Sequence, residues 1–244
     1  GSQIGGRKNI IINGAMNVAQ RGTSSTSTTG GYHTVDRFRY AIGGQDEAAT
    51  HAQVDVASGT DPYKSGFRKA FKITNGNQTS GAGASDYIQI DHYVEAQDVA
   101  NSGWDYTQTN SFITLQFWVK SSVAQNFYFY FQSDNGSQYR YVMETGSLTA
   151  NTWTKVTKTI PGNSNIVLNN DTGAGMYIVW NIFDGTDRTG TRPLNAWAVL
   201  DNANRTLITI LIFWSLHQII GPISVLIKTV EDLLSRDLLN WIIK

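Results

Sequence analysis

Short runs in which apolar and polar residues alternate dominate the first 205 residues of the chain. The clearest run sets one alternate set of residues against the other: Ile113, Leu115, Phe117 and Val119 against Thr114, Gln116, Trp118 and Lys120. Successive side chains of a strand point to opposite faces of a sheet, so this pattern predicts a strand with one buried face. Comparable runs lie within residues 36–42, 85–99, 151–162 and 175–187, separated by clusters of Gly, Asn, Asp and Ser. No segment before residue 205 shows a clear helical period, and the whole predicts an all-β sandwich or barrel.

Two features refine this prediction. Residues 127–131 are aromatic on both faces, and the turn sequence Ser-Asp-Asn-Gly at 133–136 leads into residues 139–143, which predicts a β-hairpin. Near the start, residues 8–13 form a short apolar run that ends at Asn13-Gly14, which predicts a short strand and a turn.

The last 40 residues have a different pattern. Residues 207–227 carry no formal charge, and residues 223–241 place apolar side chains on one helical stripe, which predicts a mostly helical segment. The length would admit a membrane span. Four polar residues and the Gly221-Pro222 break favour instead a buried or partner-covered segment: Thr209, Ser215, His217 and Gln218.

Composition narrows the classes of function. Charged residues make up 16% of the chain, and 19 basic residues balance 19 acidic ones, so no electrostatic footprint for nucleic acid is present. Without cysteine, no disulfide, thiolate metal site or cysteine nucleophile can form. The four histidines lack metal-ligand spacing, and no phosphate-binding loop or nucleophile elbow occurs, so we expect no catalytic site.

Five segments, in this order and spacing, resemble a structural module of bacteriophage tail fibres and other virion appendages. They are KNIIINGAMNVAQRGTS (8–24), VDRFRY (35–40), FITLQFWVKSS (112–122), NTWTKVTKTIPG (151–162) and NRT (204–206). The resemblance covers about residues 7–206. It implies a jelly-roll β-sandwich similar to carbohydrate-binding modules, a place on the phage particle, other virion proteins as partners, and a homo-oligomer such as a trimer. Residues 1–6 are interpreted as a tag or linker.

The end of the chain departs from this pattern. Members of the family continue after the NRT segment with a Trp-containing strand and a closing strand, whereas residues 207–244 are an apolar, amphipathic segment. Either this segment supplies the closing strand in another form, or a frameshift, recombination or artificial junction placed it there.

Binding through aromatic side chains is the chemistry that the sequence supports best. Sugar recognition needs flat aromatic faces flanked by polar groups. Trp104 and Tyr106 lie in a polar loop, and the hairpin supplies four further candidates: Tyr128, Tyr130, Tyr139 and Tyr141. The alternative for all six is packing inside the sandwich or against another subunit.

The acidic residues support two weaker hypotheses. Asp184 and Asp187 are candidate calcium ligands, although the twelve-residue calcium loop is absent. The pairs Asp184/Asp187 and Asp86/Asp91 could serve glycoside hydrolysis only if their carboxylates lay at the required separation.

We therefore expect a non-catalytic phage appendage protein that binds a host-surface glycan, needs no cofactor and makes no contact with nucleic acid or membrane. A purely architectural component is the alternative, and a glycan hydrolase is the third. The opening segment is expected to seat the module, with the receptor site further along the chain.

Overall fold

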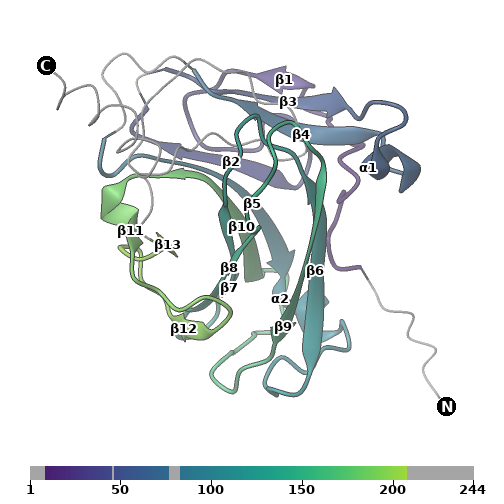
Figure 1. The fold of residues 1–244 in the computed structure, drawn as a ribbon. Coiled ribbons are helices and arrows are strands. Elements are labelled where there is room, and N and C mark those ends of the chain that lie inside the picture. The colour runs from purple at the N-terminus through teal and green to yellow at the C-terminus, as the bar shows by residue number, and fades with distance from the viewer. Residues whose placement is uncertain (1–8, 46, 77–82, 208–244) are drawn as a thin grey trace, which may run out of the picture.

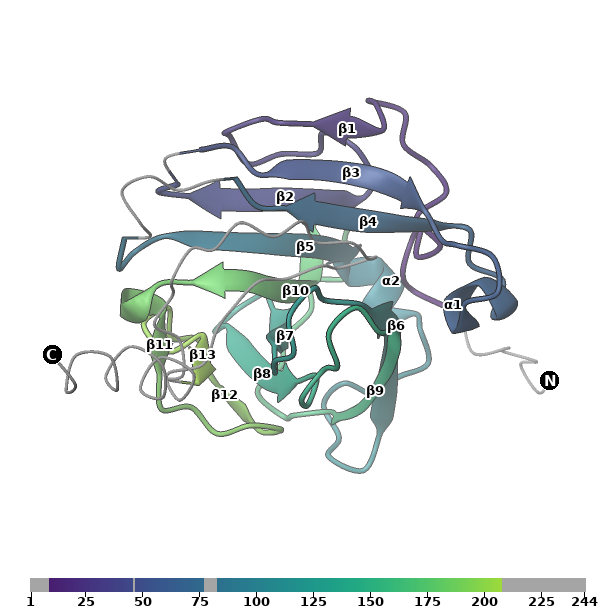
Figure 2. The same ribbon diagram turned by 45° about the horizontal axis from the view of Figure 1, so that its top comes forward.

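Antiparallel sheets build the protein, as the alternation predicts. The computed structural model describes residues 9–45, 47–76 and 83–207. The largest sheet has six strands in the order β12-β8-β7-β10-β5-β2 (Figures 1 and 2). Its strands are β2 (Phe38–Gly43), β5 (Tyr87–Glu95), β7 (Tyr128–Ser133), β8 (Tyr139–Glu144), β10 (Ala174–Asp184) and β12 (Trp197–Val199).

Two smaller sheets cover the apolar face of the six-stranded sheet. One consists of β1 (Ser24–Ser25), β3 (Thr50–Asp55) and β4 (Lys69–Thr74), and the other of β6 (Phe112–Val119) and β9 (Thr154–Pro161). Ring contacts join the layers: Tyr40 stacks on His51 with centroids 4.3 Å apart, and Phe117 meets Phe129 edge-on at 5.0 Å. The core therefore lies between the six-stranded sheet and the two smaller sheets.

The remaining elements are short. Helix α1 spans Asp61–Lys64, α2 spans Ala96–Ala100, and the 3₁₀ helix η1 spans Thr186–Arg188. Strands β11 (Thr189–Gly190) and β13 (Thr206–Leu207) form a small parallel pair. Within the described ranges, no helix is long and apolar enough to cross a membrane.

Most local predictions agree with this structure. The all-β class is confirmed, and β7 and β8 form the predicted hairpin. In β6, Leu115 and Val119 are buried and Phe117 packs on the core, while Thr114 and Gln116 are exposed, as the alternation requires. The predicted helix at 223–241 lies outside the described residues.

The opening segment differs from its prediction. Residues 9–13 form no strand. The predicted turn is present, and in it the amide of Met16 donates to the carbonyl of Asn13 at 2.8 Å. Ile10 is nevertheless buried in the core. The apolar run thus attaches the opening segment to the core through Ile10. The side chain of Asn13 forms hydrogen bonds with nearby backbone groups, where a strand would have bonded to a neighbouring strand.

Candidate functional site

The outer face of β5, which points away from the core, carries polar and aromatic side chains. Ile88 and Ile90 point into the core, so the alternate residues Asp91 and Tyr93 point outward. Arg39 of β2 stands in register with Asp91. Its Nη1 donates to Asp91 Oδ2 at 3.1 Å and to Tyr93 Oη at 2.5 Å.

Three tyrosines form a row at this place. The ring of Tyr93 contacts that of Tyr177 on β10, with centroids 4.5 Å apart, and meets Tyr32 edge-on at 6.5 Å. All three side chains are partly exposed. Because Tyr32 comes from the Ser/Thr/Gly-rich loop and the others from neighbouring strands, only the tertiary structure assembles the row.

A groove of about 580 Å³ lies beside Tyr32 and Tyr93. We call it the tyrosine groove. It is lined by residues of the opening segment, of the β2 and β5 strand ends and of the loop before β10: Ile12, Asn13, Val18, Gln20, Arg21, Tyr32, Asp36, Arg37, Tyr93, Glu95, Thr172 and Ala174. The opening segment thus forms one wall of the groove.

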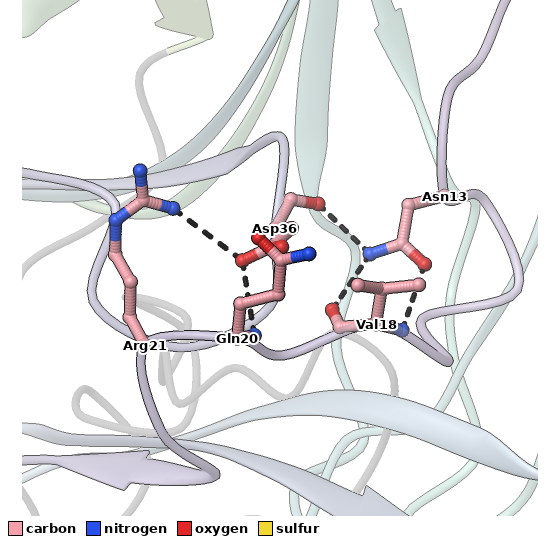
Figure 3. Close-up of polar contacts among 5 residues, drawn as sticks. All are labelled: Asn13, Val18, Gln20, Arg21 and Asp36. Atoms are coloured by element: carbon pink, nitrogen blue, oxygen red, sulfur yellow. Dashed lines mark hydrogen bonds and ion pairs between the residues drawn. The ribbon is translucent and has the colours of Figure 1, made fainter.

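Hydrogen bonds that Asn13 donates and accepts, and others that Asp36 accepts, hold this wall in place (Figure 3). The Nδ2 of Asn13 donates to the carbonyls of Val18 and Asp36, both at 2.9 Å, and its Oδ1 accepts from the Val18 amide at 3.0 Å. The Asp36 carboxylate accepts from the Gln20 amide at 3.3 Å and from Arg21 Nη1 at 3.4 Å. Asn13 has a φ of 58°, a left-handed conformation that asparagine tolerates better than most residues.

Two ion pairs supply the charge of the tyrosine groove. Arg21 pairs with Asp36 at 3.4 Å, and Arg37 pairs with Glu95 at 3.5 Å. Arg21 is the most exposed of these four residues, with 58% of its side chain accessible to solvent. The groove therefore offers aromatic rings, hydrogen-bond donors and carboxylate acceptors together.

The loop candidates from the sequence lie elsewhere and are less exposed than the loop composition suggests. Trp104 is 6% exposed and belongs to the core, and its Nε1 donates to the Ser111 carbonyl at 3.2 Å. Tyr106 is partly exposed and packs against the same core. The polar loop thus turns its tryptophan inward.

The four hairpin tyrosines divide between the two faces of the six-stranded sheet. Tyr141 belongs to the core, whereas Tyr130 packs with Val142 and Val179 on the opposite face. Tyr128 and Tyr130 are 9% and 4% exposed, and Tyr139 is partly exposed. The structure therefore does not gather the six candidates into one surface.

The candidate calcium ligands differ in their surroundings. Asp184 is buried, whereas Asp187 lies exposed on η1. The charges of Arg205, Arg188 and Arg140 act on Asp184, which is the opposite of a cation site. Over the described ranges, no group of three or more His, Asp or Glu side chains could hold a metal ion.

The members of the Asp86/Asp91 pair are far apart along the chain. Asp86 directly precedes β5, and Asp91 lies five residues further along, within that strand. At the rise of a strand their Cα atoms are about 16 Å apart, beyond the roughly 5–10 Å at which two-carboxylate glycoside hydrolysis places its carboxyl groups.

The pKa values of buried groups predict a pH effect on stability. Burial raises the pKa of Asp184 to about 7, above its usual value of 3.8, although Arg205 opposes the change. The folded state then holds a proton that the unfolded state has lost, so this group's contribution to stability falls as pH rises from about 4 to 7. Burial lowers the pKa of His51 and of His92 to about 4. The unfolded state therefore holds the extra proton between about pH 4 and 6.5, and the contribution of the two histidines to stability rises with pH in that range.

Asp184→Asn separates these opposing effects. The variant retains both histidines and lacks only the titration of Asp184. When the pH rises from 5 to 7.5, its free energy of unfolding should therefore increase by about 2–3 kcal/mol relative to that of the parent chain. Urea denaturation of both proteins at the two pH values measures the difference. An equal pH response of the two proteins would contradict the assignment.

Comparisons with known proteins add one likeness. No protein-family model and no curated protein matches the chain. The structure is similar to the enzymatically active domain of tailspike protein 4 of bacteriophage CBA120, with a TM-score of 0.39 and 11% sequence identity. The match covers 65% of this chain and 19% of the tailspike chain, so it spans about one fifth of the length of that protein.

The sequence contained a signal for part of the tyrosine groove. Tyr93 belongs to an outward-facing set on a strand whose other face is largely apolar, which is the pattern of a sheet with one solvent-facing side. Tyr32, Arg37 and the residues around Asn13 had no such signal, because they reach the site through turns and long-range hydrogen bonds.

Proposed function

We propose that this chain is a component of a phage virion appendage, such as a tail fibre, and that it binds a host-surface glycan without cleaving it. The appendage role rests on the ordered resemblance of residues 7–206 to the phage structural module, with which an all-β chain agrees. The jelly-roll form of the sandwich, homo-oligomerisation and contacts with other virion proteins belong to the same proposal.

The tyrosine groove is the observation that supports glycan binding. Sugars present apolar C–H faces that pack on aromatic rings, and hydroxyl groups that need both donors and acceptors. Tyr32 and Tyr93 supply rings at the groove, Arg21 supplies donors, and the carboxylates of Asp36 and Glu95 supply acceptors. The ion pairs with Arg21 and Arg37 fix the positions of those carboxylates before the glycan binds, so little side-chain entropy is lost on binding.

Tyr93 is the best single residue with which to test this proposal. Its ring contacts Tyr32 and Tyr177, and Arg39 holds its hydroxyl. We expect Tyr93→Ala to lower affinity for the bound glycan about tenfold or more, because the stacking ring is lost. Binding would be measured on a glycan array and then by calorimetry with the glycans that the parent chain binds.

The matched control is Tyr63→Ala on α1, another partly exposed tyrosine that lies under Arg68 and outside the groove. It should leave affinity unchanged. Tyr32→Ala provides a second groove variant that leaves the Arg39 hydrogen bonds in place. Thermal denaturation must show both groove variants folded. Retained affinity in both would overturn the groove assignment.

A purely architectural role is the alternative, and exposed apolar side chains favour it. Phe112 is 58% exposed and Val199 is 61% exposed, which suits contact with neighbouring subunits. A stable oligomer that binds no glycan and covers Tyr32 and Tyr93 would support this alternative. A glycan hydrolase is the third proposal, and it requires two carboxylates at one groove, where Asp36 and Glu95 are each paired with arginine.

A further inference from the structure

A second aromatic surface lies on the solvent face of the β6–β9 pair, on the other side of the core from the six-stranded sheet. Leu115, Val119 and Val156 turn into the core. The alternate residues Gln116, Thr157 and Lys155 are exposed, and Trp118 and Trp153 are partly exposed. Figures 1 and 2 show the two strands side by side at the edge of the molecule.

Tryptophans and lysines alternate across the two strands. Trp118 stands directly opposite Lys155, and the Lys155 Nζ lies 6.0 Å from the centre of the Trp118 ring. One step further out, the Lys120 Nζ lies 5.9 Å from the centre of the Trp153 ring. Each tryptophan therefore has a lysine across the strand pair. We call these four residues the Trp–Lys patch.

The two strands that carry the patch are polar on their outer face. Neither β6 nor β9 contains Asp or Glu, and none of the ion pairs found among the described residues includes Lys155. Next to the patch, Gln116 Nε2 donates to Thr157 Oγ1 at 3.0 Å, and Thr114 stands opposite Thr159. Positive charge, indole rings and a ladder of hydroxyl groups thus follow one another along the strands.

We infer that the Trp–Lys patch binds an acidic polysaccharide, with sugar rings on the two tryptophans and a carboxylate or sulfate on Lys155. Diagonal neighbours across a strand pair lie about 7–8 Å apart, the scale of neighbouring sugar rings. A lysine close to an aromatic face places the anion beside the ring that stacks on the same sugar. The threonine and glutamine ladder accepts and donates hydrogen bonds to hydroxyl groups beyond the patch.

Charge density separates this ligand from nucleic acid. A nucleic acid carries a phosphate at every nucleotide, and its partners present many cations along one face. The Trp–Lys patch has two lysines and no arginine, on a chain whose basic and acidic residues balance. A polysaccharide such as hyaluronan, which carries one carboxylate per disaccharide and several hydroxyl groups between successive carboxylates, matches this sparse charge and the neighbouring threonines better.

The test is affinity electrophoresis of the full chain in gels that contain polygalacturonate, hyaluronan or dextran sulfate. Methyl-esterified polygalacturonan and dextran serve as the matched neutral polymers. We expect retardation by at least one acidic polymer and by neither neutral one, weakening as salt is added. Lys155→Gln and Trp153→Ala should each lower the affinity about 5- to 10-fold.

Lys64→Gln is the control, since Lys64 is an exposed lysine on α1, ion-paired with Asp61 at 3.0 Å. It should leave binding unchanged, and so should Tyr93→Ala in the tyrosine groove, which separates this inference from the proposed function. Four results would overturn the inference: no binding to any of the three acidic polymers, equal binding to the neutral ones, loss of binding in Tyr93→Ala but not in Lys155→Gln, or an oligomer that the patch variants dissociate. Tighter binding of an oligodeoxythymidylate probe, lost in the same patch variants, would also overturn it.

Discussion

Replacing Trp104 with alanine is expected to lower the free energy of unfolding by about 3–5 kcal/mol. The indole is 6% exposed, and its ring lies 6.1 Å from that of Phe131 and 6.4 Å from that of Tyr106. Alanine would leave a cavity between the loop and the core and would remove one of the two donors to the Ser111 carbonyl, which would keep the Gly162 amide. Urea denaturation followed by circular dichroism measures the change.

This prediction matters for function, because Trp104 is also a glycan-binding candidate. A variant that unfolds loses every activity, so loss of binding in Trp104→Ala alone would be uninformative. Trp104→Phe retains most of the apolar bulk and should cost less, about 1–2 kcal/mol. If Trp104→Ala kept the parent stability but bound no glycan, the loop would be the sugar site that its sequence suggested.

Replacing Arg140 with alanine should also lower the free energy of unfolding by about 3–5 kcal/mol. Arg140 is 2% exposed, and burial lowers the pKa of its guanidinium to about 10. It donates to Gln132 Oε1 at 2.8 Å and to the Asp201 carbonyl at 3.1 Å, and it lies over the Tyr130 ring at 4.0 Å. Truncation would leave Gln132 without this partner and would release residues 201–202 from the outer face of the sheet.

Two variants make this prediction specific. Arg140→Met replaces the buried charge by apolar volume and should cost less than Arg140→Ala, because no cavity forms. Arg68→Ala removes an exposed arginine, which also lies over a tyrosine ring at 3.8 Å, and should change stability by less than about 1 kcal/mol. Similar losses in Arg140→Ala and Arg68→Ala would show that burial of Arg140 has little effect.

Local alternation was sufficient to predict the strands that contact their sequence neighbours. The β7–β8 hairpin is an example, because its turn and both strands lie within residues 128–144. The inward and outward faces of β6 also follow from period two alone. The same reasoning was wrong for residues 9–13, where side-chain hydrogen bonds and burial of Ile10 replace strand pairing.

The six aromatic candidates show where local reasoning stops. A polar loop composition suggested exposure of Trp104, yet the fold turns its indole into the core. Exposure depends on what packs above a side chain, and that neighbour is often distant in sequence. Phe131, which contacts Trp104, is 27 positions further along the chain.

The sequence by itself determined the β class, the hairpin and the face that each long strand buries, because side chains alternate with a period of two whatever the strand packs against. It also contained the alternation that places Tyr93 and Asp91 on the outer face. Only the tertiary structure decided that Tyr32 and Asn13 line one groove with Tyr93, and that Arg39 bonds to both Asp91 and Tyr93. Their contacts, such as Arg39 with Asp91 and Asn13 with Asp36, link residues 52 and 23 positions apart. Such contacts depend on sheet order and loop path, which a pattern of neighbouring residues does not encode.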